Sequence, residues 1–282
     1  MLLALPIYGQ NRETDYLSHV LEKMNAVESV TYHCVKKAWE PGDKEPVDNV
    51  PREIYEHVNP QDTAVGYSFL CASDKEFRQP LWVYDGTVFA YIEKEEKEVR
   101  IDDFTQKSPL PFRVIMPQAF GCMKSILEYA LNTQDSIVLS LKDEGKDYLM
   151  ELSIHTPYQV EFFGKACYMP QNPYIYDPTS IYKIWISKEN DMPYRYRREM
   201  QHSISEDICS DFVYNPSGKG KIVAEDYYPA DYVRRIKGEK SQKATVDMTG
   251  KKAPDWTLTD MKGQQVSLSG IKSKVILLQF TG

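Results

Sequence analysis

The chain of 282 residues carries 34 basic and 41 acidic side chains, a formal net charge of −7, and because this charge repels phosphate backbones, nucleic acid is not expected as a partner. Hydrophobic residues make up 42% of the chain and charged residues 27%, a composition that can bury a core and differs from that of disordered chains. The length corresponds to about two domains, and no run reaches the ~18 apolar residues of a transmembrane segment.

The first ten residues, 1–10, are apolar and end on small or polar side chains. They lack the charged start and the full apolar length of a signal peptide, and we interpret them as the remnant of a signal sequence. The alternative is an N-terminal strand packed on the core, because a run this short is also of strand length. The first interpretation predicts an extracytoplasmic protein, either free in the periplasm or associated with the cell envelope.

The ordered part is predicted to begin with a helix over residues 16–27, where apolar residues recur at helical spacing. Residues 29–38 are rich in Val, Thr and Tyr and are predicted to form a strand. The Pro- and charge-rich segment 40–51 is typical of a loop. From residue 64 onward, turn-forming residues separate four predicted strands, 66–72, 80–84, 87–94 and 98–101. Asp85-Gly86 predicts a hairpin between the second and third of these, because a type I′ turn needs positive φ at both central positions.

A second helix is predicted over residues 117–131, which carry Phe120, Met123 and Ile126 at helical spacing. A turn at 144–146 is predicted to join strands 136–141 and 148–154. The pattern then returns to strands, which we place at 159–163, 181–187, 194–200 and 208–214.

The strands 81–84 and 181–187 have aromatic and aliphatic residues on both of their faces. Trp82 and Tyr84, for example, alternate with Leu81 and Val83. A sheet with only one covered face should alternate more cleanly between apolar and polar residues. We therefore expect the second face to be covered, either permanently or transiently by a ligand.

Three segments resemble the LolA-like family of periplasmic lipoprotein carriers. Residues 21–37, LEKMNAVESVTYHCVKK, resemble its first helix and strand; residues 83–91, VYDGTVFAY, resemble its hairpin of an Asp-Gly turn and an aromatic strand; and residues 184–196 resemble its closing hairpin. The resemblance implies an α+β domain over residues 11–236, a curved antiparallel sheet (half-barrel) with two helices. Its concave face would hold an acyl chain or a hydrophobic peptide.

The candidate ligand-binding residues are aromatic side chains of these strands. They are Trp82, Tyr84, Phe89, Tyr91 and Trp185. The alternative is that they pack beneath the two helices, which is the more ordinary role for any single one of them. A binding cavity requires several of them to converge on a concave surface.

The C-terminal segment resembles a second family. After a polar, Lys-rich stretch that we interpret as a linker, 237–249, residues 250–269 (GKKAPDWTLTDMKGQQVSLS) resemble the opening of thioredoxin-like domains of the TlpA and redoxin (AhpC/TSA) type. The resemblance implies a truncated thioredoxin-like α/β domain over residues 250–282, with a buried central strand at 275–278. In the family this strand leads to a Cys-x-x-Cys motif, which would here follow Gly282.

Three functions are compatible with these patterns. The first is a fragment of an exported thiol-disulfide oxidoreductase, with protein thiols and disulfides as partners and no catalytic residue within the chain. The second is a carrier of a hydrophobic ligand or lipoprotein, and the third is a peroxidase of the peroxiredoxin type, which shares the Ala-Pro-Asp opening.

The cysteines and histidines predict no metal site or cofactor, because neither set has ligand spacing. The cysteines are Cys34, Cys71, Cys122, Cys167 and Cys209. In an exported protein one or two long-range disulfides stay open as a hypothesis, and the sequence does not pair them.

Overall fold

The computed structural model of the chain describes residues 8–40, 42–105, 113–171, 173–238, 250–260, 262–273 and 275–276. The chain divides into two compact units, Met1–Glu239 and Lys240–Gly282, and each is described by itself. Residues 1–7 of the predicted signal-sequence remnant and residues 239–249 of the predicted linker lie outside the described residues. Both assignments, and the domain boundaries, stay predictions.

The first unit is built on one large sheet. Among the described residues it has twelve strands in the order β14-β6-β5-β4-β3-β2-β1-β13-β12-β11-β8-β7, and all neighbours are antiparallel except β14 and β6, which pair in parallel. The strands are β1 (Ser29–Trp39), β2 (Asp48–Val58), β3 (Tyr67–Ala72), β4 (Pro80–Tyr84), β5 (Val88–Glu93), β6 (Glu98–Asp103), β7 (Ile137–Glu144), β8 (Asp147–Ile154), β11 (Ser180–Ser187), β12 (Met192–Met200), β13 (Ser203–Tyr214) and β14 (Val233–Ile236). A separate short hairpin pairs β9 (Val160–Phe162) with β10 (Ala166–Tyr168).

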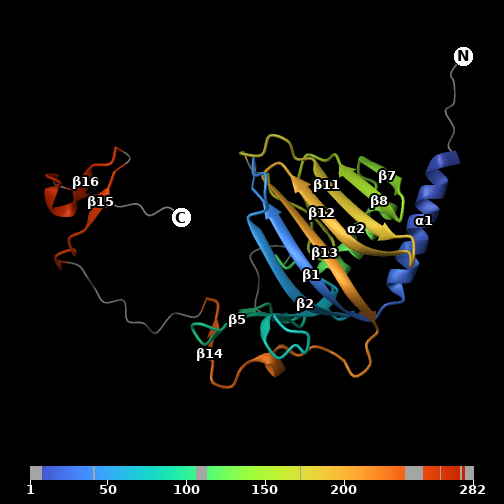
Figure 1. Cartoon of the computed structure of the whole chain (residues 1–282), viewed down its shortest axis with the longest axis horizontal. Helices are drawn as coiled ribbons and strands as arrows, with labels where there is room; N and C mark the ends of the chain where they lie inside the picture. The colour runs from blue at the N-terminus through green and yellow to red at the C-terminus, as the bar shows by residue number, and fades with distance from the viewer. Residues whose placement is uncertain are drawn as a thin grey trace, which may run out of the picture. The chain divides into compact units, whose positions relative to one another are not determined.

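Two helices, α1 (Tyr8–Asn25) and α2 (Ala119–Asn132), lie on the same face of this sheet. In Figure 1, α2 lies behind β11, β12 and β13, and β5 crosses below β1 and β2 at a steep angle, so the sheet curves. The predicted α+β fold, a curved antiparallel sheet with two helices, is confirmed. The helix α1 begins at Tyr8 and not at residue 16, so it takes in the last residues of the predicted signal-sequence remnant.

The strand β2 was not predicted, because residues 40–51 have the composition of a loop. The structure places Asp48–Val58 in a strand between β1 and β3. Its pattern is obscured by Pro51 and by the charged residues Arg52 and Glu56, which lie on the same face as the buried Ile54. Pairing with two neighbouring strands overrides these unfavourable local preferences.

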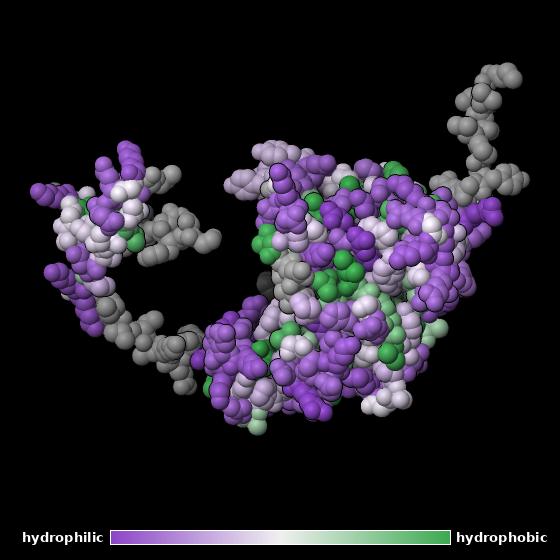
Figure 2. All heavy atoms as spheres, viewed as in Figure 1, coloured by the Kyte–Doolittle hydropathy of each residue, from purple (hydrophilic) through white to green (hydrophobic). Residues whose placement is uncertain are grey.

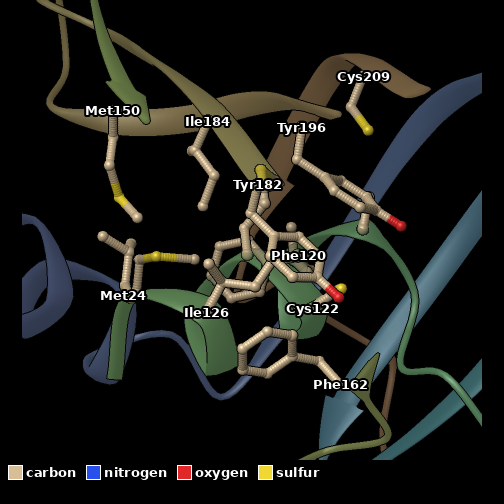
Figure 3. Packing of buried hydrophobic residues seen from close by; sticks show 14 of the residues in the cluster. Met24, Phe120, Cys122, Ile126, Met150, Phe162, Tyr182, Ile184, Tyr196 and Cys209 are labelled. Carbon is tan, nitrogen blue, oxygen red and sulfur yellow. The ribbon is translucent and has the colours of Figure 1, made fainter. Parts of the chain in front are cut away.

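The face of the sheet that packs on the helices is called the inner face, and the opposite one the outer face. On α2, Phe120 and Ile126 are fully buried and meet Tyr182 and Ile184 of β11 on the inner face. Figure 3 shows these side chains pointing toward one another, with Met150 of β8 beside them. The apolar stripe that predicted α2 is therefore its core-facing side.

Part of the outer face is covered by the chain itself. Val83 of β4 and Ala90 of β5 are buried there against Ile222 and Ala224. These two belong to a segment, 219–236, that returns across the outer face through the short 3-10 helix η1 (Ala224–Tyr227) and ends in β14. The prediction that the second face is covered is confirmed for β4.

The second unit does not contain the predicted thioredoxin-like domain in its described residues. They form a hairpin of β15 (Thr257–Thr259) and β16 (Gln265–Ser267), followed by the 3-10 helix η2 (Leu268–Gly270). Val275, predicted to start a buried strand, is 84% exposed and lies outside any strand, and residues 277–280 lie outside the described residues. A central strand needs a layer on both faces, and none of the described residues of this unit is buried.

Candidate functional site

Four of the five candidate aromatic residues lie together on the inner face. Trp82 and Tyr84 of β4 face Tyr91 and Phe89 of β5 in the antiparallel register. Their ring centroids are 6.2 Å apart for Trp82 and Tyr91 and 6.4 Å apart for Tyr84 and Phe89. Because residues two apart in a strand share a face, the Asp85-Gly86 hairpin is what brings the four side chains together.

The hairpin turn is fixed by its own polar groups. Asp85 accepts hydrogen bonds from the backbone N–H groups of Thr87, at 2.8 Å, and Val88, at 3.0 Å. Gly86 has a φ of 98°, and a Cβ there would lie 2.5 Å from Nδ2 of Asn59. Only glycine fits this position without a shift of the neighbouring chain.

The four aromatic residues change from buried to exposed along the sheet. Tyr84 is fully buried; its hydroxyl donates to Asp62 at 2.6 Å and accepts from Arg113 at 2.7 Å. Phe89 is half-buried, and Tyr91 is 47% exposed. Tyr84 thus belongs to the core, whereas Phe89 and Tyr91 line the open end of the inner face.

A cavity of about 400 Å³ opens at this end, and we call it the β5–β6 cavity. It is lined by Phe89, Tyr91, Glu98, Arg100, Ile101, Asp102, Arg235, Ile236 and Lys237. The three cations in its wall have acidic partners: Arg235 pairs with Glu98, Lys237 with Asp102 at 2.8 Å, and Arg100 with Glu93 at 3.5 Å. The cavity therefore combines an aromatic side with a rim of ion pairs.

Arg52 of β2 lies beside the aromatic residues and was not among the predicted site residues. Its guanidinium carbon is 4.8 Å from the ring centroid of Trp82. Its positive charge also affects the pKa of Tyr91. Burial and the Cys71 thiol raise that pKa, and the Arg52 guanidinium lowers it in part. No local pattern identifies Arg52, because Trp82 is thirty positions further along the chain.

Trp185, the fifth candidate, does not join this group. It lies on β11 between Ile184 and Ile186, which point to the inner face, so its side chain is on the outer face. There the guanidinium carbon of Arg195 lies 4.0 Å from its ring centroid, and its Nε1 donates to Glu144 at 3.1 Å.

A buried carboxylate fastens α2 to the sheet. Glu56 of β2 is fully buried and accepts hydrogen bonds from the backbone N–H groups of Phe120, at 3.0 Å, and Gly121, at 3.1 Å, as well as from the hydroxyl of Tyr32. These N–H groups lie at the start of α2 and have no partner within the helix. Burial raises the pKa of Glu56 to about 7, even though these hydrogen bonds favour the ionised form.

The five cysteines are free thiols. Cys34 of β1 and Cys209 of β13 are directly opposite each other in the register. Among the described residues, no group of three or more His, Cys, Asp and Glu side chains is placed to hold a metal ion. In the same part of the chain, neither α1 nor α2 is long and apolar enough to cross a membrane.

No protein-family model matches the chain, and no curated protein matches it. Solved structures that are similar to it include the lipoprotein LppX of Mycobacterium tuberculosis, with 7% identity, 74% of this chain and 97% of that chain covered, and a TM-score of 0.37. They also include LprF of Mycobacterium bovis, with 9% identity, 74% and 98% covered, and a TM-score of 0.37. A LolA superfamily protein, NE2245 of Nitrosomonas europaea, has 10% identity, 77% and 99% covered, and a TM-score of 0.27.

The described residues of the segment 250–276 do not form a thioredoxin-like domain. Thiol exchange and peroxide reduction are therefore not proposed for this chain. At this level of structural similarity, function has to be inferred from the side chains of the protein itself.

Proposed function

We propose that the first unit is a carrier that binds a hydrophobic or amphiphilic ligand on the inner face of its sheet, in the β5–β6 cavity. The observation that carries the proposal is the placement of Phe89 and Tyr91 in the wall of this cavity, with Trp82 adjacent. Its volume of about 400 Å³ lies within the range of small-molecule sites, roughly 300–1,000 Å³. The extracytoplasmic location predicted from residues 1–10 belongs to the same proposal.

The exposure of these rings favours binding over a purely structural role. Figure 2 shows a mainly hydrophilic surface on the first unit, with hydrophobic residues in small patches. By contrast, Tyr84 and Tyr182 on the inner face are fully buried, as is Phe120 of α2. Covering apolar surface that is open to water contributes about 25 cal/mol per Å², so a ligand that lies on Phe89 and Tyr91 gains affinity there. The charged side chains of the cavity rim are already ion-paired, which is compatible with reversible binding of a ligand.

Titration with a fluorescently labelled fatty acid tests the proposal. We expect saturable binding by the wild-type protein and a loss of about tenfold in affinity, or about 1.4 kcal/mol, for Phe89→Ala and for Tyr91→Ala. Tyr91→Phe keeps the ring and should bind almost as well as the wild type. Tyr176→Ala removes a tyrosine that is 85% exposed and distant in sequence from the site, and it should bind as the wild type does. Absence of saturable binding, or equal affinity in all four variants, would exclude this site.

A further inference from the structure

Among the described residues, the inner face carries one half-buried cation, Arg52, for which no acidic partner is present. Arg52 is half-buried, and its Nε is buried without a hydrogen-bond partner. Its contact with the face of the Trp82 ring, at 4.8 Å, is a cation–π interaction and supplies only part of what the guanidinium loses on leaving water. The remaining N–H groups need an anion or water.

The other half-buried arginines in the described part of the chain are all ion-paired. Arg113 lies 3.3 Å from Asp62, Arg197 lies 3.2 Å from Glu206, and Arg195 and Arg198 contact Glu206 and Glu161. This protein therefore pairs its half-buried guanidinium groups with carboxylates as a rule, as expected from the cost of burying a charge. Arg52 is the exception, and it lies beside Trp82 and near Tyr91, at the open end of the inner face.

The neighbours of Arg52 set the shape of a ligand that would pair with it. Trp82 holds the guanidinium on one side, and the ring centroid of Tyr91 is 6.2 Å from that of Trp82. Phe89 follows at 4.7 Å from Tyr91 and leads into the β5–β6 cavity. An anionic group near Arg52 would thus be continuous with an aromatic surface, and the cations of the cavity rim would not compete for it because Glu98, Asp102 and Glu93 already pair with them.

We propose that the ligand is an amphiphile with an anionic head group, a carboxylate or a phosphate, which Arg52 binds while the apolar chain lies over Tyr91 and Phe89. This inference rests on the proposed carrier function and names its ligand class. Arginine suits this role because its planar N–H groups match the oxygen atoms of both anions.

Calorimetric titration with four probes separates the head group from the chain: dodecanoate, dodecyl phosphate, dodecanol and inorganic phosphate. The wild-type protein should bind the two anionic amphiphiles at least tenfold more tightly than dodecanol. Arg52→Gln should remove this preference and leave the affinity for dodecanol within about twofold of wild type, and Arg52→Lys should retain part of the preference. Arg195→Gln removes an arginine stacked on a tryptophan of the outer face and should keep the full preference. Circular dichroism checks that each variant is folded.

The outcomes distinguish this inference from the carrier function. Equal binding of dodecanoate and dodecanol by both wild type and Arg52→Gln would overturn the role of Arg52 and leave the carrier function intact. Binding of inorganic phosphate as tight as that of dodecyl phosphate would also overturn the inference, in favour of a site for free anions. Failure of the wild type to bind any of the three dodecyl compounds would exclude the carrier function itself.

Discussion

The half of the sheet around β11 and β12 is covered on its inner face by α1 and α2, whereas the half around β4 to β6 is covered on its outer face by residues 219–236. Around β12, the open outer face carries ion-paired side chains such as Arg197 and Glu199. Toward β5 and β6, the open inner face carries Phe89 and Tyr91. An antiparallel sheet is stable with one covered face. The side chains on the uncovered face can therefore be polar in one half of the sheet and aromatic in the other. In this protein the candidate site is the open inner face, where Phe89 and Tyr91 line a cavity.

The largest expected effect compares one aromatic residue from each half. Phe120→Ala should lower the free energy of unfolding by about 4 kcal/mol, because it leaves a cavity beneath α2, where Phe120 is almost fully buried. Tyr91→Ala should cost less than about 1 kcal/mol, because the ring is half exposed and its loss leaves no closed cavity. Urea unfolding of the two variants measures both values. Similar losses in the two variants would mean that the inner face is packed at β5 as it is under α2.

The second prediction concerns the pH dependence of the helix-covered half. The pKa of Glu56 is raised by burial from its ordinary 4.5 to about 7, so the folded protein binds a proton that the unfolded chain releases between these values. The contribution of Glu56 to stability is therefore fully present below about pH 4.5 and is lost as the pH rises through about 7. The difference between these two pKa values corresponds to about 3 kcal/mol of stability.

The difference in unfolding free energy between wild type and Glu56→Gln isolates this contribution from the other carboxylates. We expect the advantage of the wild type to decrease by about 3 kcal/mol between pH 4.5 and pH 8. Glu128→Gln, on the exposed side of α2, controls for the loss of one carboxylate. A difference that does not change with pH would show that Glu56 is ionised in the folded protein throughout this range.

The parts of the fold that were predictable are those determined by short stretches of sequence. The apolar stripe of α2 and the Asp85-Gly86 hairpin needed only neighbours within a few residues, and the hairpin also placed Trp82 and Tyr91 on one face. The strand β2 was missed because Glu56 on its inner face is stabilised by the start of α2, more than sixty residues further along the chain. Arg52 was missed because its partner, Trp82, is also distant in the sequence.

Two further predictions show that a sequence pattern does not identify which layer covers a strand. Trp185 is an aromatic residue of a predicted strand and was therefore a candidate binding residue. The alternation of β11 places it on the outer face, beneath Arg195. The apolar residues at 275–278 suggested a buried strand, yet the described residues of that unit provide no second layer to bury it. The layer on the outer face of β4 comes from residues 219–236, a segment in which the sequence analysis placed no covering element.

The smallest effect tests that outer layer, through two adjacent residues of the covering segment. Ile222 is fully buried against the outer face, whereas Val223 is 42% exposed. Ile222→Val removes one buried methyl group and should lower the free energy of unfolding by about 1 kcal/mol. Val223→Ala removes more atoms but should change it by less than about 0.5 kcal/mol, because those atoms face water. Urea unfolding with matched m-values measures the pair. If Ile222→Val leaves the free energy of unfolding unchanged while Val223→Ala lowers it, residues 219–236 do not cover the outer face of β4 to β6. The two halves of the sheet would then not differ in which face is covered.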